Sequence, residues 1–534
     1  MNPRVHDGPR GPEPFLRRSL SQTALGLGFI LLCWWAASVA FASFRVVPSP
    51  MDVVRQMLND RSALAVNAGA TLREALVGFC WGNLAAVALG AVFVRYPAVE
   101  RSLLRVAVAC YCMPLVAVGP ILVVVLPGDG PKEALAGLAV FFTTLLCTLQ
   151  GLRSANPATL DVVRALGGTA GAALWKVRVP SALPSLCAGL RVAAPASLLG
   201  AVIGEYFGAS QGLGVALVQA QSSFEVARSW GIALLLALLA GVAYGAASLL
   251  ARLLLPWADP HATLAAGGLA GKASPRGHRL AASAGYTLWS IVLGVALWYL
   301  VLRLFRLDPY FAKTPLDVWR YLFGGPGAGQ NRAELADAVR VTVLDAGVGY
   351  ACGTALAVLA AVVMAAAPLV ERALMPAAVF MRSVPILAVA PLVALVFGRG
   401  LLGVTAVVSA VVFFPTLVFV LSGLRGAPRA AGEVVEAMGG SPVEVIRRVR
   451  LWYGLPSLFT AARNAVPSAL GGAILAEWLS TGQGAGNLLV VAYSESQFDT
   501  LWSGSVVLIA LAAGSYALLG LAEEAVLGRW SGGG

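Results

Sequence analysis

Two glutamates lie within segments that are otherwise apolar, and each follows an arginine at the same distance. Glu205 comes fourteen residues after Arg191. Arg463 and Glu477 have the same spacing. On an α-helix this spacing places the acid within about 40° of the arginine's face and about 21 Å further along the axis. A carboxylate in an apolar medium is costly unless it faces a wet cavity or a polar partner. We therefore predict that both glutamates flank a polar pathway, or that each satisfies a neighbouring helix terminus or the glycine-rich turn that follows it.

Two polar segments, 161–184 and 433–456, share a second pattern: an acid, a small residue, a glycine, a basic amphipathic stretch and a proline. A short helix that docks in a groove on another protein needs a tight turn, an apolar face and a basic rim. Proline then favours the start of the next helix. The alternative is an ordinary basic loop in each half. The pattern is carried by Asp161, Ala165, Gly167, Gly168, Pro180 and Pro184, and by Glu433, Ala437, Gly439, Gly440 and Pro456.

Residues that would support catalysis or metal binding are missing from the apolar segments. The histidines are His6, His261 and His278, which lie outside these segments. No pair of the seven cysteines has zinc-ligand spacing with histidines nearby. Residues 267–273 come nearest to a phosphate-binding loop, but the spacing is wrong and no Ser or Thr follows Lys272. The sequence therefore predicts no catalytic residue, no cofactor and no metal site.

The composition indicates a membrane protein. Of 534 residues, 58% are hydrophobic and 12% are charged, whereas soluble domains carry about 25% charged residues. This difference excludes a soluble enzyme. The net charge of +12 comes from arginines in short loops, as the positive-inside rule expects. We therefore expect a lipid bilayer, and no nucleic acid, around this chain.

The apolar segments are long enough to cross about 30 Å of hydrocarbon as helices. The first, 19–44, is too long for the apolar region of a signal peptide and has a counterpart at 280–302, so we expect no cleaved leader. The total is six helices in each half and twelve in all. The others are predicted at 75–94, 106–128, 134–152, 183–207 and 229–251, and at 346–370, 383–398, 400–424, 455–479 and 500–522.

The second half of the sequence repeats the first. Residues 71–78 match 342–349 at an offset of 271, and residues 161–168 match 433–440 at an offset of 272. Because each copy has an even number of spans, the copies are expected to lie parallel, with a pathway between them. The predicted organisation is a cytoplasmic tail at 1–18, a six-helix unit at 19–255, a flexible cytoplasmic linker at 256–283 and a second unit at 284–530.

Basic residues predict the orientation. Four arginines precede the first span and three basic residues lie in the linker, which places both on the cytoplasmic side, together with the N- and C-termini. Three arginines in the first loop on the other side oppose this assignment in part.

The two polar loops resemble the glycine-containing coupling loop of binding-protein-dependent ABC importer permeases, which inserts into the ATPase subunit and transmits its movements. Residues 47–54, 313–319 and 381–391 are similar to segments of the nitrate/sulfonate/taurine-type permeases. The similarity covers nearly all of residues 20–530. The chain departs from that family at Trp452, which replaces the first of two prolines, and in having Val-Val where Ala-Ala is usual in both loops.

This resemblance implies an all-α integral membrane protein of the type I ABC importer permease fold, with twelve transmembrane helices as two parallel six-helix repeats in a bacterial plasma (inner) membrane. It implies two ATP-binding-cassette ATPase subunits and an extracytoplasmic substrate-binding protein as partners. The implied substrates are nitrate, sulfonates or taurine, bicarbonate, or pyrimidine-type vitamin precursors. The candidates for lining the pathway are Glu205, Glu477, Pro114, Pro120, Pro385 and Pro391.

Two other classes remain open. A twelve-helix secondary transporter usually contains inverted repeats and intramembrane acids that couple ions, and no inverted repeat is visible here. A membrane-embedded enzyme would need paired carboxylates or a nucleophile with its base, which the spans lack. Uptake that depends on ATP rather than on an ion gradient would separate the first class from an ABC importer.

Overall fold

The computed structural model describes residues 47–257, 279–367 and 396–528, with scattered positions between 28 and 42 and between 370 and 393. Helices joined by short turns make up this part of the chain, and it contains no strand. The first half contains α2 (Pro50–Asn59), α3 (Arg61–Arg95), α4 (Pro97–Cys112), α5 (Leu115–Val125), α6 (Gly130–Arg153), α7 (Pro157–Ala165), α8 (Ala170–Ala173), the π-helical turn η2 (Leu174–Arg178), α9 (Val179–Glu205), α10 (Leu213–Ser222) and α11 (Val226–Leu254).

The second half follows the same order from α12 onward. It contains α12 (Arg279–Leu304), α13 (Pro315–Trp319), η3 (Arg320–Gly324), α14 (Ala328–Ala366), α17 (Leu401–Arg425), α18 (Arg429–Ala437), α19 (Pro442–Val445), η4 (Ile446–Arg450), α20 (Leu451–Ala476), η5 (Glu477–Thr481), α21 (Gly484–Ser494) and α22 (Phe498–Leu527). Most of the predicted helix at 383–398, with the predicted pathway residues Pro385 and Pro391, lies outside the described residues.

Among the described residues, seven helices are long and apolar enough to cross a membrane, or eight if one bent pair is a single span. The predicted total of twelve is therefore not confirmed. The bent pair corrects the prediction of one helix at 106–128, because α4 and α5 meet at 99°. Met113 is extended there, with ψ 121°, since a residue that precedes a proline avoids the α conformation.

Glycines let the helices of each half pack closely, and they do so at matching positions. A Cβ on Gly78 of α3 would lie 2.4 Å from the Cβ of Ala136 on α6. A Cβ on Gly349 of α14, at the same point of the repeat, would lie 2.5 Å from the Cβ of Val408 on α17. Small residues let helix backbones approach in a membrane, where van der Waals packing drives association. The two halves therefore share their packing as well as their sequence pattern.

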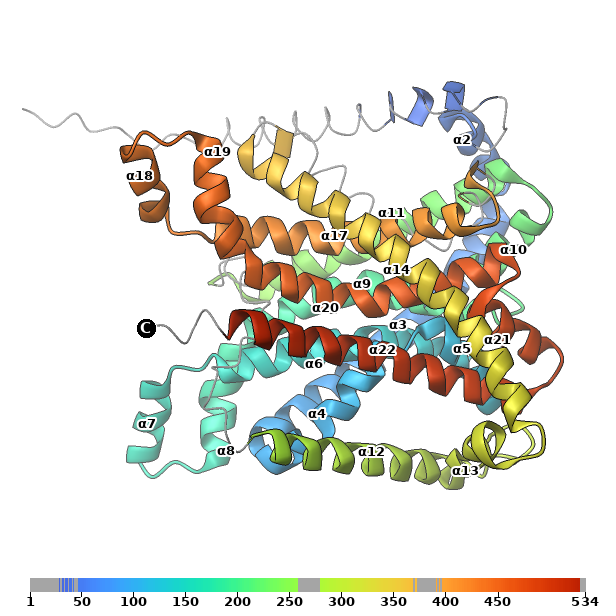
Figure 1. Cartoon of the computed structure of the whole chain (residues 1–534), viewed down its shortest axis with the longest axis horizontal. Helices are drawn as coiled ribbons and strands as arrows, with labels where there is room; N and C mark the ends of the chain where they lie inside the picture. The colour runs from blue at the N-terminus through green and yellow to red at the C-terminus, as the bar shows by residue number, and fades with distance from the viewer. Residues whose placement is uncertain are drawn as a thin grey trace, which may run out of the picture.

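The long helices place the connecting elements at two opposite ends of the molecule (Figure 1). The hairpins α7–α8 and α18–α19, which we call the docking hairpins, project from one end. The short elements α2, α10, α13 and α21 lie at the other end, which we call the far end.

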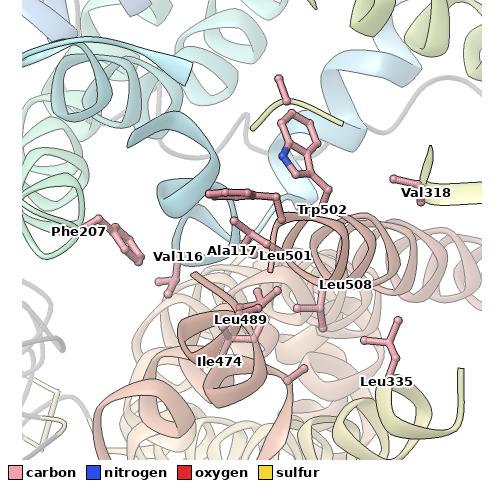
Figure 2. Close-up of a cluster of buried hydrophobic side chains, with 14 of the residues drawn as sticks. Val116, Ala117, Phe207, Val318, Leu335, Ile474, Leu489, Leu501, Trp502 and Leu508 are labelled. Carbon is pink, nitrogen blue, oxygen red and sulfur yellow. The ribbon is translucent and has the colours of Figure 1, made fainter. Parts of the chain in front are cut away.

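The halves are interleaved rather than simply side by side. Helix α12 of the second half packs along α4 of the first, and the Ser290 hydroxyl donates to the carbonyl oxygen of Ser102 at 3.0 Å. An apolar cluster joins α5 of the first half to helices of the second: Figure 2 shows Val116 and Ala117 beside Leu501, Leu489 and Ile474.

Candidate functional site

Aromatic side chains from both halves meet at the far end of α9 and α20. Tyr206 and Trp478 occupy matching positions of the repeat, and their rings meet edge to face with centroids 5.5 Å apart. Equivalent residues of two related units can meet only on the axis that relates the units. The pseudo-two-fold axis of the chain therefore passes between Tyr206 and Trp478. Residues 206, 207, 478 and 493 are called the aromatic layer below.

Phe207 closes the aromatic layer on the side of the first half. Its ring stacks on Trp478 with centroids 4.7 Å apart and an angle of 3° between the planes. The Tyr493 hydroxyl donates to the carbonyl oxygen of Phe207 at 3.2 Å. A Cβ on Gly119 of α5 would lie 2.1 Å from the Phe207 ring, so only glycine admits the ring there. Figure 2 shows Phe207 pointing towards Val116 at the start of α5.

Helix α5 is therefore part of the boundary between the halves. Pro114 and Pro120 both lie on or next to it and are buried. The Ser505 hydroxyl of α22 donates to the carbonyl oxygen of Ala117 across the boundary at 3.0 Å. The structure thus brings the two described prolines beside the boundary, and a pathway-lining role for them stays a prediction.

A second contact between the halves lies closer to the docking hairpins. The ring of Tyr111 in α4 meets the edge of Tyr516 in α22, with centroids 6.4 Å apart. The Arg463 guanidinium lies 4.5 Å from the Tyr516 ring centroid. It also forms an ion pair with Glu523 at 3.1 Å. The intramembrane arginine of the second half is thus paired.

The carboxylate of Glu205 is buried and fully bonded. Glu205 is only 1% exposed. It accepts hydrogen bonds from the Thr71 hydroxyl at 2.6 Å and from the backbone N–H of Gly214. The N–H of Leu213 in turn donates to the Thr71 hydroxyl at 2.9 Å. Glu205 and Thr71 together therefore hold the start of α10 against α3.

The second half repeats these partners around Glu477, but both hydrogen bonds go to Oε2, and the buried Oε1 has no hydrogen-bond partner among the residues that the structure describes. Thr342 of α14 donates to the carboxylate at 2.9 Å and the N–H of Gly486 does so at 2.8 Å. The Ala485 N–H donates to the Thr342 hydroxyl at 2.9 Å. These contacts correspond to the interpretation in which each glutamate satisfies the glycine-rich turn that follows it. A pathway-lining role for Glu205 or Glu477 stays a prediction.

We call the hydrogen bonds of Glu205 and Thr71, and the matching bonds of Glu477 and Thr342, the brace of each half. In the first half a buried cation lies beside the brace. The Lys132 ammonium donates to Glu74 at 2.7 Å and to Asp129 at 2.6 Å, and its hydrogen bond holds the pKa of Asp129 below its usual range. At the matching positions, the second half has Asp345 and Val404, and no lysine or arginine of the described residues pairs with Asp345. Lys132 was not among the predicted site residues, although a lysine in the first turn of an apolar helix was a visible signal in the sequence.

Both docking hairpins turn on the predicted glycines. Gly167 and Gly439 have φ of 75° and 81°, a left-handed conformation that costs other residues about 1 kcal/mol or more. The N–H of Gly168 reaches the carbonyl oxygen of Val163 at 2.8 Å, and Gly440 makes the same bond to Val435 at 2.9 Å. The helix α7 or α18 of each docking hairpin thus ends in a Schellman motif. The other residues of the pattern, Asp161, Ala165, Glu433 and Ala437, are exposed on α7 and α18.

The prolines of the pattern differ from the prediction that they open the membrane helices. Pro184 and Pro456 lie inside α9 and α20, which begin at Val179 and Leu451. Pro180 does lie in the first turn of α9. The π-helical turns η2 and η4 precede these helices directly, and their wider turn lets the chain run from each docking hairpin into the membrane helix without a break.

Each docking hairpin also presents an apolar side chain that the sequence analysis missed. Leu166 is 82% exposed and Met438, at the matching position, is 84% exposed. Val162 and Val434, four residues earlier on the same helices, are also more than half exposed, and a contiguous exposed apolar patch marks an interaction site. The signal was the apolar residue that directly precedes each turn glycine.

Comparisons with known proteins agree with the two-fold repeat. The model of the family described as "Binding-protein-dependent transport system inner membrane component" matches twice, at residues 79–262 and 353–527. A formylaminopyrimidine transport permease of Halalkalibacterium halodurans is 28% identical over 45% of this chain and 98% of its own length. A riboflavin transport system permease of Chloroflexus aurantiacus is 31% identical over 44% of this chain and 90% of its own. A taurine transport system permease of Escherichia coli is 26% identical over 39% of this chain and 79% of its own length. These relatives correspond in length to one half of the chain.

Proposed function

Because this chain belongs to the family of binding-protein-dependent transport system inner membrane components, we propose that its two halves form one solute pathway along the pseudo-two-fold axis. The chain is the permease component of an ABC importer, a membrane protein and not an enzyme. The relatives described above correspond to one such unit each, so the fused chain would provide both units of the membrane component. The proposed pathway runs past α5, α9, α20 and α22.

The observation that supports this pathway is the aromatic layer. A contact between Tyr206 and Trp478 lies on the axis, where a pathway between equivalent units has to pass. The stacked pair of Phe207 and Trp478 blocks it. We therefore assign the aromatic layer as the closed end of the pathway, on the side away from the docking hairpins.

For the substrate, we propose a planar heterocycle of the pyrimidine type. Stacking on aromatic side chains recognises flat rings and is worth about 1–3 kcal/mol per base. Small anions such as nitrate or a sulfonate are instead bound by basic groups or helix N-termini. The aromatic layer contains neither, and buried glutamates lie directly beside it. Relatives named for formylaminopyrimidine and riboflavin are 28% and 31% identical, against 24% and 26% for those named for sulfonates and taurine.

For the partners, we propose that each docking hairpin binds one ATPase subunit. Leu166 and Met438 would enter a groove on that subunit, and the hairpin would transmit its movement to α9 or α20. This assignment would place the hairpins, and with them both termini, in the cytoplasm. An extracytoplasmic binding protein would then deliver the solute to α10 and α21 at the far end.

Reconstitution tests this function. The chain is placed in vesicles with its ATPase subunits and binding protein, and uptake of labelled formylaminopyrimidine and of taurine is measured. We expect ATP-dependent uptake of the pyrimidine alone, and a loss of at least tenfold in Trp478→Ala. Uptake driven by an ion gradient without ATP would instead indicate a secondary transporter, and uptake of taurine alone would contradict the proposed substrate.

A further inference from the structure

A groove opens at the hairpin end of the second half, where η4 joins α20. It has a volume of about 630 Å³, within the range of about 300–1,000 Å³ that is typical of small-molecule sites. Its walls are apolar and its rim is charged. The wall residues are Val358, Val420, Leu424, Leu451, Gly454, Leu455 and Leu458, and the rim residues are Glu444, Arg447, Arg448 and Trp452.

The groove reaches the depth of the membrane. Val358 lies eight residues before the end of α14, which is about 12 Å along the helix, and Leu458 lies seven residues, or about 10 Å, into α20. Helix α14 is apolar and long enough to span a bilayer. A peripheral protein that binds the docking hairpins does not reach this depth, whereas an acyl chain of the surrounding lipid does.

The charged rim favours an anion. The Glu444 carboxylate is already used, because it accepts hydrogen bonds from the Ser441 N–H at 2.9 Å and from Arg448 at 3.1 Å. Arg447 forms no ion pair or hydrogen bond with any residue that the structure describes. One positive charge at the mouth of the groove therefore remains to be balanced.

The position of the rim is fixed by a π-helical turn and by a side-chain hydrogen bond to the end of α14. The π-helical turn η4 carries Arg447 and Arg448, and its Arg450 donates to the carbonyl oxygen of Ala365, at the end of α14, at 2.9 Å. Trp452 lies just beyond and is about half exposed. Tryptophan is enriched where a membrane helix crosses the headgroup region, which accounts for its presence where the first half has Pro180.

From these observations we propose that the groove binds one anionic phospholipid of the membrane leaflet on the hairpin side. Its phosphate lies between Arg447 and Arg448, and one acyl chain lies along Val358, Leu455 and Leu458. The site is specific to the second half, because Trp175 and Lys176 stand at the positions of the two arginines in the first half. The proposal does not depend on which solute the chain carries.

Native mass spectrometry of the delipidated chain, bound to its ATPase subunits and titrated with phosphatidylglycerol or phosphatidylcholine, tests the site. We expect one phosphatidylglycerol to bind at least tenfold more tightly than phosphatidylcholine. Arg447→Gln/Arg448→Gln removes this preference, whereas Lys176→Gln, the matched control in the first half, keeps it. Glycerol phosphate, which has the charge but no acyl chain, does not compete.

A second variant separates the lipid from the ATPase subunit as occupant. Leu458→Trp fills the groove at membrane depth with both arginines intact, and it should weaken phosphatidylglycerol binding at least tenfold while the ATPase subunits stay bound. Unchanged lipid binding in this variant or in the arginine variant overturns the proposal. An arginine variant that keeps the lipid and loses the ATPase subunits would assign the rim to subunit docking instead.

Discussion

At the scale of single residues, the buried glutamates act on the shape of the turn that follows them. Glu205 and Glu477 each bind a threonine on α3 or α14 and a backbone N–H at the start of α10 or α21. The turn between the glutamate and this N–H begins with the residues of the aromatic layer. We therefore expect these carboxylates to position the rings of the aromatic layer, whether or not they line the pathway themselves.

Glycine next to each carboxylate is needed for this brace. Gly484 has φ of 84°, and a Cβ there would lie 2.3 Å from the carboxyl carbon of Glu477. We expect Gly484→Ala to lower the free energy of unfolding by about 2 kcal/mol or more, from backbone strain and from displacement of the carboxylate. Thermal unfolding in detergent measures this. Gly241→Ala on α11 is the control, because no atom lies within 4 Å of its added methyl group; equal melting temperatures would contradict the brace.

Lys132 offers a second prediction at this scale. Lys132→Met would leave Glu74, which is 3% exposed, without its cation, and loss of one partner of a buried pair costs about 3–5 kcal/mol. We expect a clearly lower melting temperature, part of which returns in Lys132→Met/Glu74→Gln because the uncompensated charge is gone. A single variant as stable as the parent chain would show that the ion pair does not stabilise the fold.

The sequence located both glutamates but did not decide between their two interpretations. The repeat identified the acids because matching positions in two halves rarely coincide by chance. Their partners could not be predicted, because Thr71 is 134 residues away from Glu205. Which helix faces carry the two residues depends on packing that a single sequence does not specify.

At the scale of elements, the docking hairpins were the most predictable part of the chain. Their glycines, with φ of 75° and 81°, lie where the acid-to-glycine spacing placed them. The break between α4 and α5 and the π-helical turns η2 and η4 were not predicted. Uninterrupted hydrophobicity indicates a span but carries no information on a bend, and π-helical turns have no pattern of their own in the sequence.

The exposed tips of the hairpins lead to a prediction about assembly. We expect Leu166→Asp/Met438→Asp to weaken binding of the ATPase subunits at least tenfold, because a charge replaces the apolar side chain that would be buried in their groove. Both residues are more than 80% exposed, so the chain itself should melt as before. Co-purification and receptor-stimulated ATP hydrolysis measure the effect.

A matched control lies at the far end. Phe224 is 71% exposed and has φ of 57°, a conformation that aspartate tolerates. Phe224→Asp therefore introduces one of the two added charges away from the hairpins and should leave ATPase binding unchanged. Equal binding by the hairpin variant and this control would remove the docking assignment.

At the scale of the whole molecule, the two halves are similar but not identical across their axis. Tyr206 meets Trp478 on the axis, yet Phe207 stacks on Trp478 while its counterpart, Leu479, has no aromatic ring. The Lys132 ion pair exists only in the first half. Fusion in one chain lets each half vary alone, which two copies of one subunit cannot do. The two hairpins, as proposed docking sites, are therefore free to differ from each other in sequence.

The contacts between the halves imply that the linker is not needed to hold them together. Aromatic stacking at Phe207 and Trp478, the edge contact of Tyr111 with Tyr516 and the packing of α12 on α4 all cross the boundary. An interface with apolar, interleaved helices is typical of obligate partners.

We therefore expect residues 1–257 and 279–534, expressed as two chains, to co-purify from membranes. Their rate of ATP-dependent uptake should lie within about threefold of the rate of the intact chain, since the linker adds only effective concentration. A split within the first half, between α6 and α7, is the control, because it separates helices that pack on one another inside one repeat. If the linker split abolished assembly while each half remained folded, residues 258–278 would have to contribute more than a connection, and the division of the chain into two six-helix units would be wrong at that boundary.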